Sequence, residues 1–170
     1  TDGTISVSAT AIDAAGNTSS AGTTSFTLDT APPIASVSAE SSSNTTHTLA
    51  KAGDTITASF SSTDTVSTVT IGGNSATVTN TGGNNYNATY VVASGDNALA
   101  MDVIVNSIDA AGNTASASLA SAVTVDTAAP SAPTFALGTG VTGGATAAEA
   151  TQGSGVVTVN AENGSAVSVT

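Results

Sequence analysis

The chain has very little positive charge and no cysteine. Its 170 residues include one basic side chain against twelve Asp or Glu, which gives a formal net charge of −11. A single basic residue cannot neutralise a nucleic-acid backbone or hold an anionic membrane surface, so we expect neither partner. The absence of Cys excludes disulfides, thiolate metal sites and a cysteine nucleophile.

Aromatic residues and long apolar runs are also scarce. Trp is absent and aromatic residues make up 3% of the chain, so large stacking platforms for sugars or bases are not expected. No run of about 18 apolar residues occurs, and we therefore expect no insertion into a membrane. The acidic residues stand singly among Thr, Ser, Ala, Val, Gly and Asn, whereas a disordered acidic tail would have a dense charge run.

What the sequence does contain is an internal repeat. The heptapeptide Ile-Asp-Ala-Ala-Gly-Asn-Thr at residues 12–18 recurs without change at 108–114. A second landmark, Phe-Thr-Leu-Asp-Thr-Ala at 26–31, corresponds to Val-Thr-Val-Asp-Thr-Ala at 123–128. The two offsets differ by one residue, as a variable loop between the landmarks would cause. A period of about 100 residues suits a β-sandwich domain.

The period divides the chain into three segments. Residues 1–29 are predicted to be the C-terminal strands of one domain, residues 30–126 a complete domain, and residues 127–170 the opening strands of a third. Each outer segment lacks most of a core, so we do not expect it to fold alone. We expect the chain to be part of a longer tandem array, in which its partners are the neighbouring repeats of the same chain.

Short alternating runs predict seven strands in the middle segment. Thr and Val are frequent in these runs, and Gly, Asn, Asp and Ser cluster between them. No apolar period of 3.6 persists over ten residues, so almost no helix is expected. The sequence thus predicts an all-β fold of immunoglobulin-like β-sandwich domains in tandem, without the Cys…Trp…Cys pattern of antibody domains. The predicted strands cover residues 34–40, 54–60, 66–71, 75–79, 86–92, 101–108 and 120–125.

Alternation within these strands predicts which side chains form the core. The inward faces should carry Ile56, Ala58 and Phe60, then Tyr86, Ala88, Tyr90 and Val92, then Met101, Val103 and Val105, and finally Val123 and Val125.

The repeated motif resembles a known family. Asp-Ala-Ala-Gly-Asn-Thr, followed by a strand that ends in Asp-Thr-Ala and a nearby Pro, looks like the bacterial Ig-like tandem repeats of giant surface adhesins, including biofilm and RTX-type adhesins. Residues 52–57 are similar to the usual opening of the second strand in that family, and residues 156–165 resemble the start of another repeat. The resemblance implies extracellular modules at the bacterial cell surface or in a secreted matrix. Such modules are often stiffened by Ca²⁺ at domain junctions and carry a binding domain away from the cell.

Strand parity predicts which loops meet where the chain enters the middle domain, an end that we call the entry pole. Strand 34–40 leaves this pole and strand 54–60 returns to it, so the loop with Asp64 should lie there. Strand 101–108 also returns, which brings Asp109 and Asn113 to the same end. Because the entering linker carries Asp29, three segments distant in sequence should converge at one junction.

Clustered carboxylates repel one another unless a cation lies between them. The chain has no Arg, and Lys51 alone cannot serve every junction. A hard divalent cation such as Ca²⁺, which binds about 6–8 oxygen ligands, is the expected counter-charge. By the repeat, Asp13 with Asn17 would serve the upstream junction and Asp126 the downstream one. The alternative is that Asp-x-x-Gly-Asn is simply a good turn, in which Asp accepts backbone N–H groups and Gly and Asn tolerate positive φ.

Three classes of function differ in how well they fit these features. A structural extender module of a large adhesin fits the repeat, the low charge and the missing Cys. A ligand-binding adhesin domain for a sugar or a protein would need a long loop, an aromatic patch or a flat Thr array. An enzyme is not expected, since the chain has one His and no zinc-protease, phosphate-loop or Ser–His–Asp pattern. A carboxylate pair could hydrolyse glycosides, but the expected acidic cluster lies at a junction rather than in a cleft.

Overall fold

The structure is a computed structural model that describes residues 2–151 and 155–169. The chain divides into two compact units, with the boundary between Thr127 and Ala128. Strands dominate the described residues, where helix is limited to a 3₁₀ turn, Val141–Gly143, and to α1, Ala147–Ala150. The predicted all-β class is therefore confirmed. None of these helices has the length and apolar character needed to cross a membrane.

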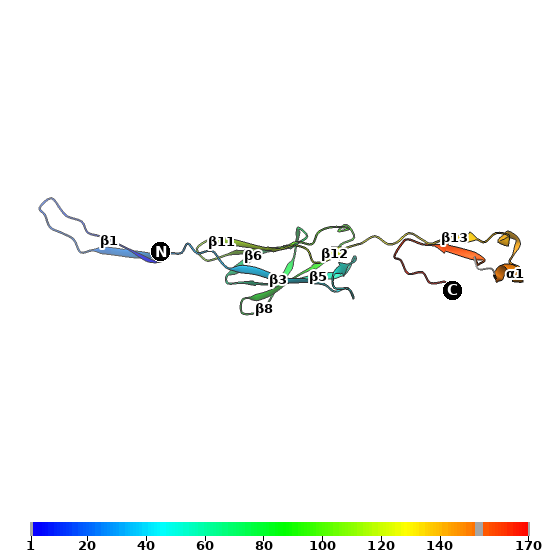
Figure 1. Ribbon diagram of the computed structural model, residues 1–170. Coiled ribbons are helices and arrows are strands. Elements are labelled where there is room, and N and C mark those ends of the chain that lie inside the picture. The colour runs from blue at the N-terminus through cyan, green and yellow to red at the C-terminus, as the bar shows by residue number, and fades with distance from the viewer. Residues whose placement is uncertain (1, 152–154, 170) are drawn as a thin grey trace. The chain divides into compact units, whose positions relative to one another are not determined.

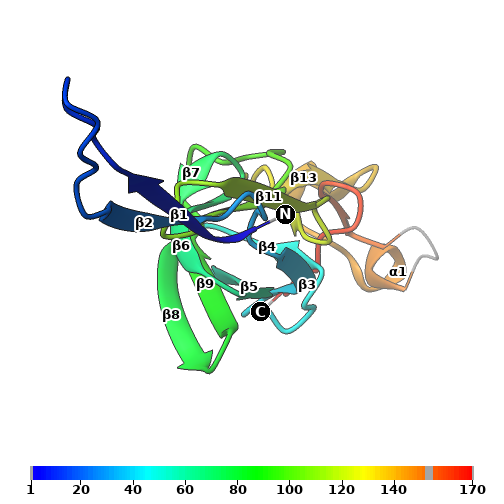
Figure 2. The ribbon, with the colours of Figure 1, turned by 90° about the vertical axis from the view of Figure 1, so that its left-hand side faces the viewer.

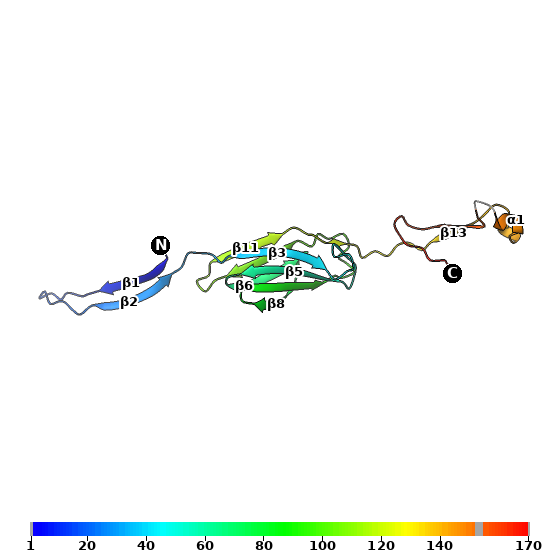
Figure 3. The same cartoon turned by 60° about the horizontal axis from the view of Figure 1, so that its bottom comes forward.

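A two-sheet sandwich forms the centre of the first unit. One sheet has the strand order β3-β5-β9-β8, and the other has the order β11-β10-β6-β7. Neighbouring strands within each sheet are antiparallel. The two sheets face each other (Figure 2), and the strand axes of one sheet lie nearly along those of the other (Figure 3). The strands of the first sheet are β3 (Ala35–Ser42), β5 (Thr55–Ser62), β9 (Asn85–Val91) and β8 (Thr77–Gly82). Those of the second sheet are β11 (Thr114–Leu119), β10 (Val103–Ile108), β6 (Thr65–Ile71) and β7 (Asn74–Ser75).

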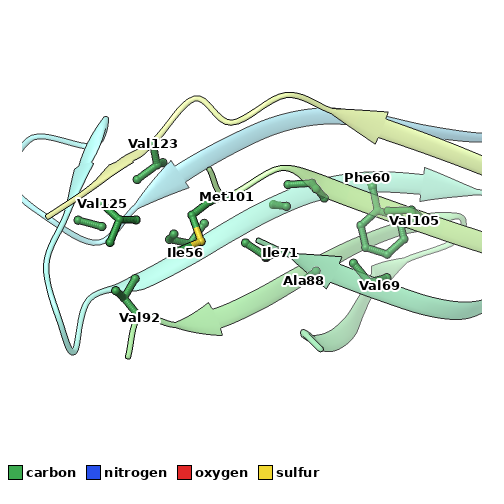
Figure 4. Packing of buried hydrophobic residues seen from close by; sticks show 13 residues of the cluster. Ile56, Phe60, Val69, Ile71, Ala88, Val92, Met101, Val105, Val123 and Val125 are labelled. Carbon is green, nitrogen blue, oxygen red and sulfur yellow. The ribbon is translucent and has the colours of Figure 1, made fainter. Parts of the chain in front are cut away.

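The core lies between the two sheets, and alternation along each strand selects its members. In β5 every second residue is buried, because successive side chains of a strand point to opposite faces. The predicted inward residues are buried, except that Tyr86 and Tyr90 remain partly exposed at the margin of the core. Phe60 and Tyr86 stack with their ring centroids 5.2 Å apart. Figure 4 shows the cluster, which consists of Ala50, Ile56, Ala58, Phe60, Val69, Ile71, Ala88, Val92, Met101, Val103, Val105, Val123 and Val125.

Gly72 allows the chain to turn tightly beside the core. A Cβ atom at this position would lie 2.6 Å from the sulfur of Met101, and its φ of +59° is in the left-handed region that favours glycine. The Gly72 N–H donates to the Asp102 carbonyl at 3.0 Å. The turn after β6 is therefore held against the segment that leads into β10.

Two parts of the sandwich differ from the predicted strands. The strand predicted at 75–79 is divided between β7 and β8, because the chain changes sheets at Ala76, whose N–H donates to Val69 O at 3.0 Å. The last strand was predicted at 120–125, but the structure forms β11 earlier and then β12 (Thr124–Val125), which pairs in parallel with β4 (Leu49–Ala50). The residues between β11 and β12 carry the chain across from the β10 edge to β4.

A separate hairpin precedes the sandwich in the first unit. It consists of β1 (Gly3–Ala9) and β2 (Gly22–Leu28), which pair antiparallel (Figure 1). Every residue of both strands is exposed, including Ile5 and Phe26. The hairpin therefore has a backbone ladder but buries none of its own apolar side chains.

The second unit is also built around a hairpin. Its strands are β13 (Thr134–Leu137) and β14 (Val157–Asn160), which pair antiparallel. Between them lies α1, whose Thr146 and Glu149 cap each other in a capping box. No residue of these strands is buried, and Phe135 is 68% exposed.

Candidate functional site

The loop between β10 and β11 folds around one carboxylate. Asp109 Oδ1 accepts the N–H of Ala111 at 2.9 Å and that of Asn113 at 2.8 Å, and Oδ2 accepts the Asn113 side-chain amide at 2.8 Å. Gly112 adopts a φ of +96°, which lets the chain reverse inside this small ring. Local side-chain-to-backbone bonds of this kind fix a turn without any ligand.

The same donors favour the ionised form of Asp109. The side-chain amide of Asn113 is the largest influence and lowers the pKa of the Asp109 carboxyl below its ordinary value. Partial burial acts in the opposite direction, and the backbone N–H groups of the loop lower the pKa further. The loop therefore presents a carboxylate that keeps its negative charge at neutral pH.

The upstream copy of the motif has the same geometry. Asp13 Oδ1 accepts the N–H of Ala15 at 2.9 Å and that of Asn17 at 2.8 Å, and Oδ2 accepts the Asn17 amide at 2.8 Å. The Asn17 amide is again the largest cause of a lowered pKa, now at Asp13. Seven identical residues thus form two loops with the same internal hydrogen bonds, one in the hairpin and one in the sandwich.

The sandwich copy also contacts the entering linker. The Asn113 side-chain amide donates to the main-chain carbonyl of Asp29 at 3.1 Å. The turn between β5 and β6 binds the same incoming segment a few residues later, because Ile34 N–H donates to Thr63 Oγ1 and Thr63 N–H donates to Ile34 O, both at 3.0 Å. The linker is therefore hydrogen-bonded to two loops of the entry pole.

Asp64 belongs to the second of these loops and is exposed. Its Oδ2 accepts the Thr63 hydroxyl at 2.9 Å, and its carbonyl accepts the Ser62 hydroxyl at 2.9 Å. The Ser62 hydroxyl is buried and lies 2.8 Å from that of Ser107, so the end of β5 is joined to the end of β10. Asp29 is exposed too, and its Oδ1 accepts the N–H of Ala31 at 3.1 Å.

The carboxylates of the entry pole are not gathered around one point. No group of three or more His, Asp or Glu side chains in the described residues is arranged to hold a metal ion. The candidate metal ligands at this pole are nevertheless all oxygen atoms, which Ca²⁺ prefers. The predicted ligands Asp29, Asp64, Asp109 and Asn113 lie on segments that share hydrogen bonds at this pole, whereas Asp13 lies in the separate hairpin.

Asp126 lies at the opposite end of the sandwich, which we call the exit pole. Its backbone N–H donates to Ala50 O at 2.9 Å, directly after β12 pairs with β4. The next residue, Thr127, is held by the loop after β9: its N–H donates to Asn97 Oδ1 and its hydroxyl to Ser94 O, both at 2.9 Å. Sequence reasoning missed this contact, although parity places that loop at the exit pole.

A buried carboxylate shapes the loop that holds Thr127. Asp96 is only 7% exposed, and its Oδ2 accepts the Tyr90 hydroxyl at 2.7 Å and the Ala93 N–H at 2.8 Å. The bond to Asp96 is the largest cause that raises the pKa of Tyr90. Ala98 has a φ of +59°, an unusual conformation for a residue with a Cβ, and its N–H donates to Val125 O at 3.0 Å. The loop is thus anchored at both its start and its end.

Glu40 is a partly buried carboxylate that also lies outside the entry pole. Its Oε2 accepts the Ala122 N–H at 2.6 Å, while its Oε1 is buried without a hydrogen-bond partner. Burial is the largest cause of its raised pKa, and the negative charge of Asp102 adds to it. Asp102 accepts the N–H of Ser121 at 2.8 Å, so two carboxylates hold adjacent peptides of the segment between β11 and β12.

Comparison with protein-family models, with curated proteins and with solved structures gave no match to this chain.

Proposed function

We propose that the chain is a structural extender module of a large bacterial cell-surface or matrix adhesin, stiffened by Ca²⁺ at its inter-domain junctions. The observation that carries the proposal is the repeated Asp-Ala-Ala-Gly-Asn loop. Two copies, 96 residues apart, have the same internal hydrogen bonds, and the copy in the sandwich binds the linker that enters it. A loop that recurs with the repeat and touches the connection between repeats suits a role at junctions.

The oxygen donors of the entry pole support Ca²⁺ as the bracing ion. Asp109, Asp64 and Asp29 would supply carboxylates, and Asn113 would add its amide oxygen. Ca²⁺ accepts irregular sets of carboxylate, amide and backbone oxygens, and extracellular Ca²⁺ modules bind with a Kd of about 10⁻⁴–10⁻³ M. By the repeat, Asp13 and Asp126 would have the same role at the neighbouring junctions. Binding to the ordered junction would raise the stability of the folded state by linkage.

The location implied by this role is extracellular, and the partners are neighbouring repeats of the same kind. The surface suits an extended module, since Lys51 pairs with Asp54 at 3.6 Å and the remaining charge is almost entirely acidic. A net charge of one sign keeps modules soluble and apart from one another.

One observation favours the alternative of a ligand-binding adhesin domain. A shallow groove of about 280 Å³ lies on the β3-β5-β9-β8 sheet and is lined by neutral hydroxyl and amide side chains. Its lining includes Tyr86 and the partly buried Asn87, but the Tyr86 ring stacks on Phe60 at the margin of the core. Neutral polar groups would suit a sugar, but hydroxyls such as those of Ser38 and Ser59 already bond within the sheet.

Thermal melting of the chain tests the proposal. Millimolar Ca²⁺ is expected to raise the Tm of the sandwich relative to EDTA, whereas the same concentration of Mg²⁺ should have a much smaller effect, since Mg²⁺ demands near-ideal octahedral geometry. Equal melting in Ca²⁺ and EDTA would contradict the calcium-braced junction and leave the repeated loop as a turn. Binding of a panel of neutral oligosaccharides, with chemical-shift changes confined to the Tyr86 groove, would favour the alternative.

A further inference from the structure

Two asparagine side chains hold the backbone of the connecting segments, one at each pole of the sandwich. At the entry pole, Asn113 Nδ2 donates to the Asp29 carbonyl at 3.1 Å. At the exit pole, Asn97 Oδ1 accepts the Thr127 N–H at 2.9 Å. Asp29 and Thr127 belong to the two copies of the Asp-Thr-Ala landmark, so both contacts act on the same short motif.

We propose that these contacts are amide clamps that fix the direction of each Asp-Thr-Ala linker independently of any cation. In this arrangement the module ahead grips the Asp carbonyl through the asparagine of its repeated loop. The module behind grips the Thr that follows, through the loop after its β9 strand. The Asp-Thr-Ala motif is therefore a docking element, and its partner is an asparagine on the neighbouring module.

Each clamp side chain is held in place before it meets the linker. The Asn113 amide group also donates to Asp109 Oδ2, so the side chain cannot rotate without breaking that bond. The Asn97 loop is anchored through Asp96, which is 7% exposed and bonded to the Tyr90 hydroxyl. A donor or acceptor that is already positioned loses little side-chain entropy when it binds. More of the energy of a single hydrogen bond is then left to stabilise the ordered linker.

The threonine hydroxyl of the motif donates to an earlier segment of the chain in both copies, although the acceptors differ in kind. The Thr127 hydroxyl donates to Ser94 O at 2.9 Å, and the Thr30 hydroxyl donates to Asp2 Oδ1 at 2.6 Å. Asp2 directly precedes β1, and Ser94 lies in the loop that leads towards β10, the counterpart of β1 in the repeat. In both copies the Thr hydroxyl therefore points back to the segment before the hairpin from which its linker emerges. The shared direction of these two bonds, to a carboxylate in one copy and to a main-chain carbonyl in the other, makes the threonine the backward anchor and the asparagine of the next module the forward one.

The general role of the clamps rests on the proposed tandem arrangement, but the contacts themselves exist within this chain. They act on main-chain atoms of Asp29 and Thr127, whereas Ca²⁺ would act on carboxylates. The two devices can therefore be separated by removing the cation. In EDTA the clamps remain, and the backbone of the linker should stay ordered.

The experiment is ¹⁵N relaxation and amide hydrogen exchange on the full chain in EDTA, comparing Asn113→Ala with Asn17→Ala. These two variants lose the same bonds to the Asp of their own loop, but within the described residues only Asn113 also reaches a linker. Asn113→Ala is expected to lower the order parameters of residues 29–31 below those of the sandwich strands, and Asn17→Ala to leave them unchanged. At the exit pole, Asn97→Ala is expected to speed exchange of the Thr127 amide by roughly twofold to tenfold, as loss of one hydrogen bond implies.

The conservative variant Thr127→Val separates the two contacts of that residue. It removes the hydroxyl bond to Ser94 but keeps the N–H bond to Asn97, so exchange of the Thr127 amide should rise less than in Asn97→Ala. A linker that is as mobile in the unmutated chain as in Asn113→Ala would overturn the entry clamp. Unchanged exchange at Thr127 in Asn97→Ala would overturn the exit clamp. Failure of Ca²⁺ to change melting would instead count against the proposed calcium brace and leave the clamps standing.

Discussion

The hairpin β1–β2 and the strands β10–β11 contain the same heptapeptide and form the same loop, yet their side chains have opposite surroundings. Met101 and Val103 are fully buried, while their repeat counterparts Ile5 and Val7 are 37% and 48% exposed. The loop needs only local donors and acceptors, so it forms in both places. Burial needs a facing sheet, and among the described residues only the sandwich strands have one, the β3-β5-β9-β8 sheet.

The largest effect is expected when two corresponding positions of the repeat, Met101 and Ile5, are each replaced by Ala. Met101→Ala should lower the free energy of unfolding of the sandwich by about 2–5 kcal/mol, because it leaves a cavity between the two sheets. Ile5→Ala should change it by less than about 0.5 kcal/mol, since its side chain already meets solvent. Urea denaturation followed by circular dichroism measures both values. A comparable loss from Ile5→Ala would mean that the hairpin shares the core of the sandwich.

The next test applies to the repeated carboxylates. Asp109→Ala removes three acceptor contacts from a loop that binds the linker, so it should lower the Tm of the sandwich, though by less than Met101→Ala. It should also reduce the Tm increase caused by Ca²⁺. Asp13→Ala removes the same contacts from the exposed hairpin and serves as the matched control, with an unchanged sandwich Tm in EDTA. An undiminished response to Ca²⁺ in Asp109→Ala would count against this carboxylate as a ligand.

Much of the sandwich was predictable because its strands alternate clearly. Ile56, Ala58 and Phe60 occupy every second position, and this period alone assigns them to the core. Residues 114–119 also alternate, but the signal is weak because two of the inward positions hold the small side chains of Ala115 and Ala117. β11 exists because its backbone pairs with β10, an interaction that sequence periodicity does not report.

The candidate site was predictable only in its topology. Parity brings the Asp64 and Asp109 loops to the entry pole, but it does not orient their side chains. The loop that contains the Tyr90–Asp96 bond also has a positive φ at Ala98, a position where the sequence offers no glycine or asparagine as a signal. The sequence therefore identifies Asn97 as a turn residue but does not predict its contact with Thr127.

A smaller effect concerns pH and distinguishes a buried carboxylate from those of the loops. Burial raises the pKa of Glu40, so the folded state holds this proton more tightly than the unfolded chain does. The contribution of Glu40 to the free energy of unfolding is therefore present at low pH and is lost as the pH rises through the pKa of Glu40 in the folded state. Glu40→Gln should be more stable than the unmutated chain at pH 7, and the difference should shrink as the pH falls towards the ordinary value of 4.5. Melting curves from pH 4 to 7 measure this, and a less stable Glu40→Gln at pH 7 would contradict it.

Asp109 and Asp13 should change the stability with pH in the opposite direction to Glu40. Their pKa values are lowered by hydrogen bonds in the folded loops, so their contribution is present above the ordinary value of 3.8 and is lost as the pH falls through the folded pKa. Carboxyl chemical shifts followed by NMR should show both groups titrating below the ordinary value of 3.8, because both loops supply the same hydrogen-bond donors. A midpoint at or above 3.8 for either group would contradict this effect of the loop hydrogen bonds.

The central claim is that the junction is braced by Ca²⁺, and small-angle scattering of the full chain in EDTA and in millimolar Ca²⁺ tests it most directly. A longer, stiffer particle in Ca²⁺, with the change abolished by Asp109→Ala, is the result that the calcium-braced extender predicts. Identical scattering curves in the two conditions would contradict it.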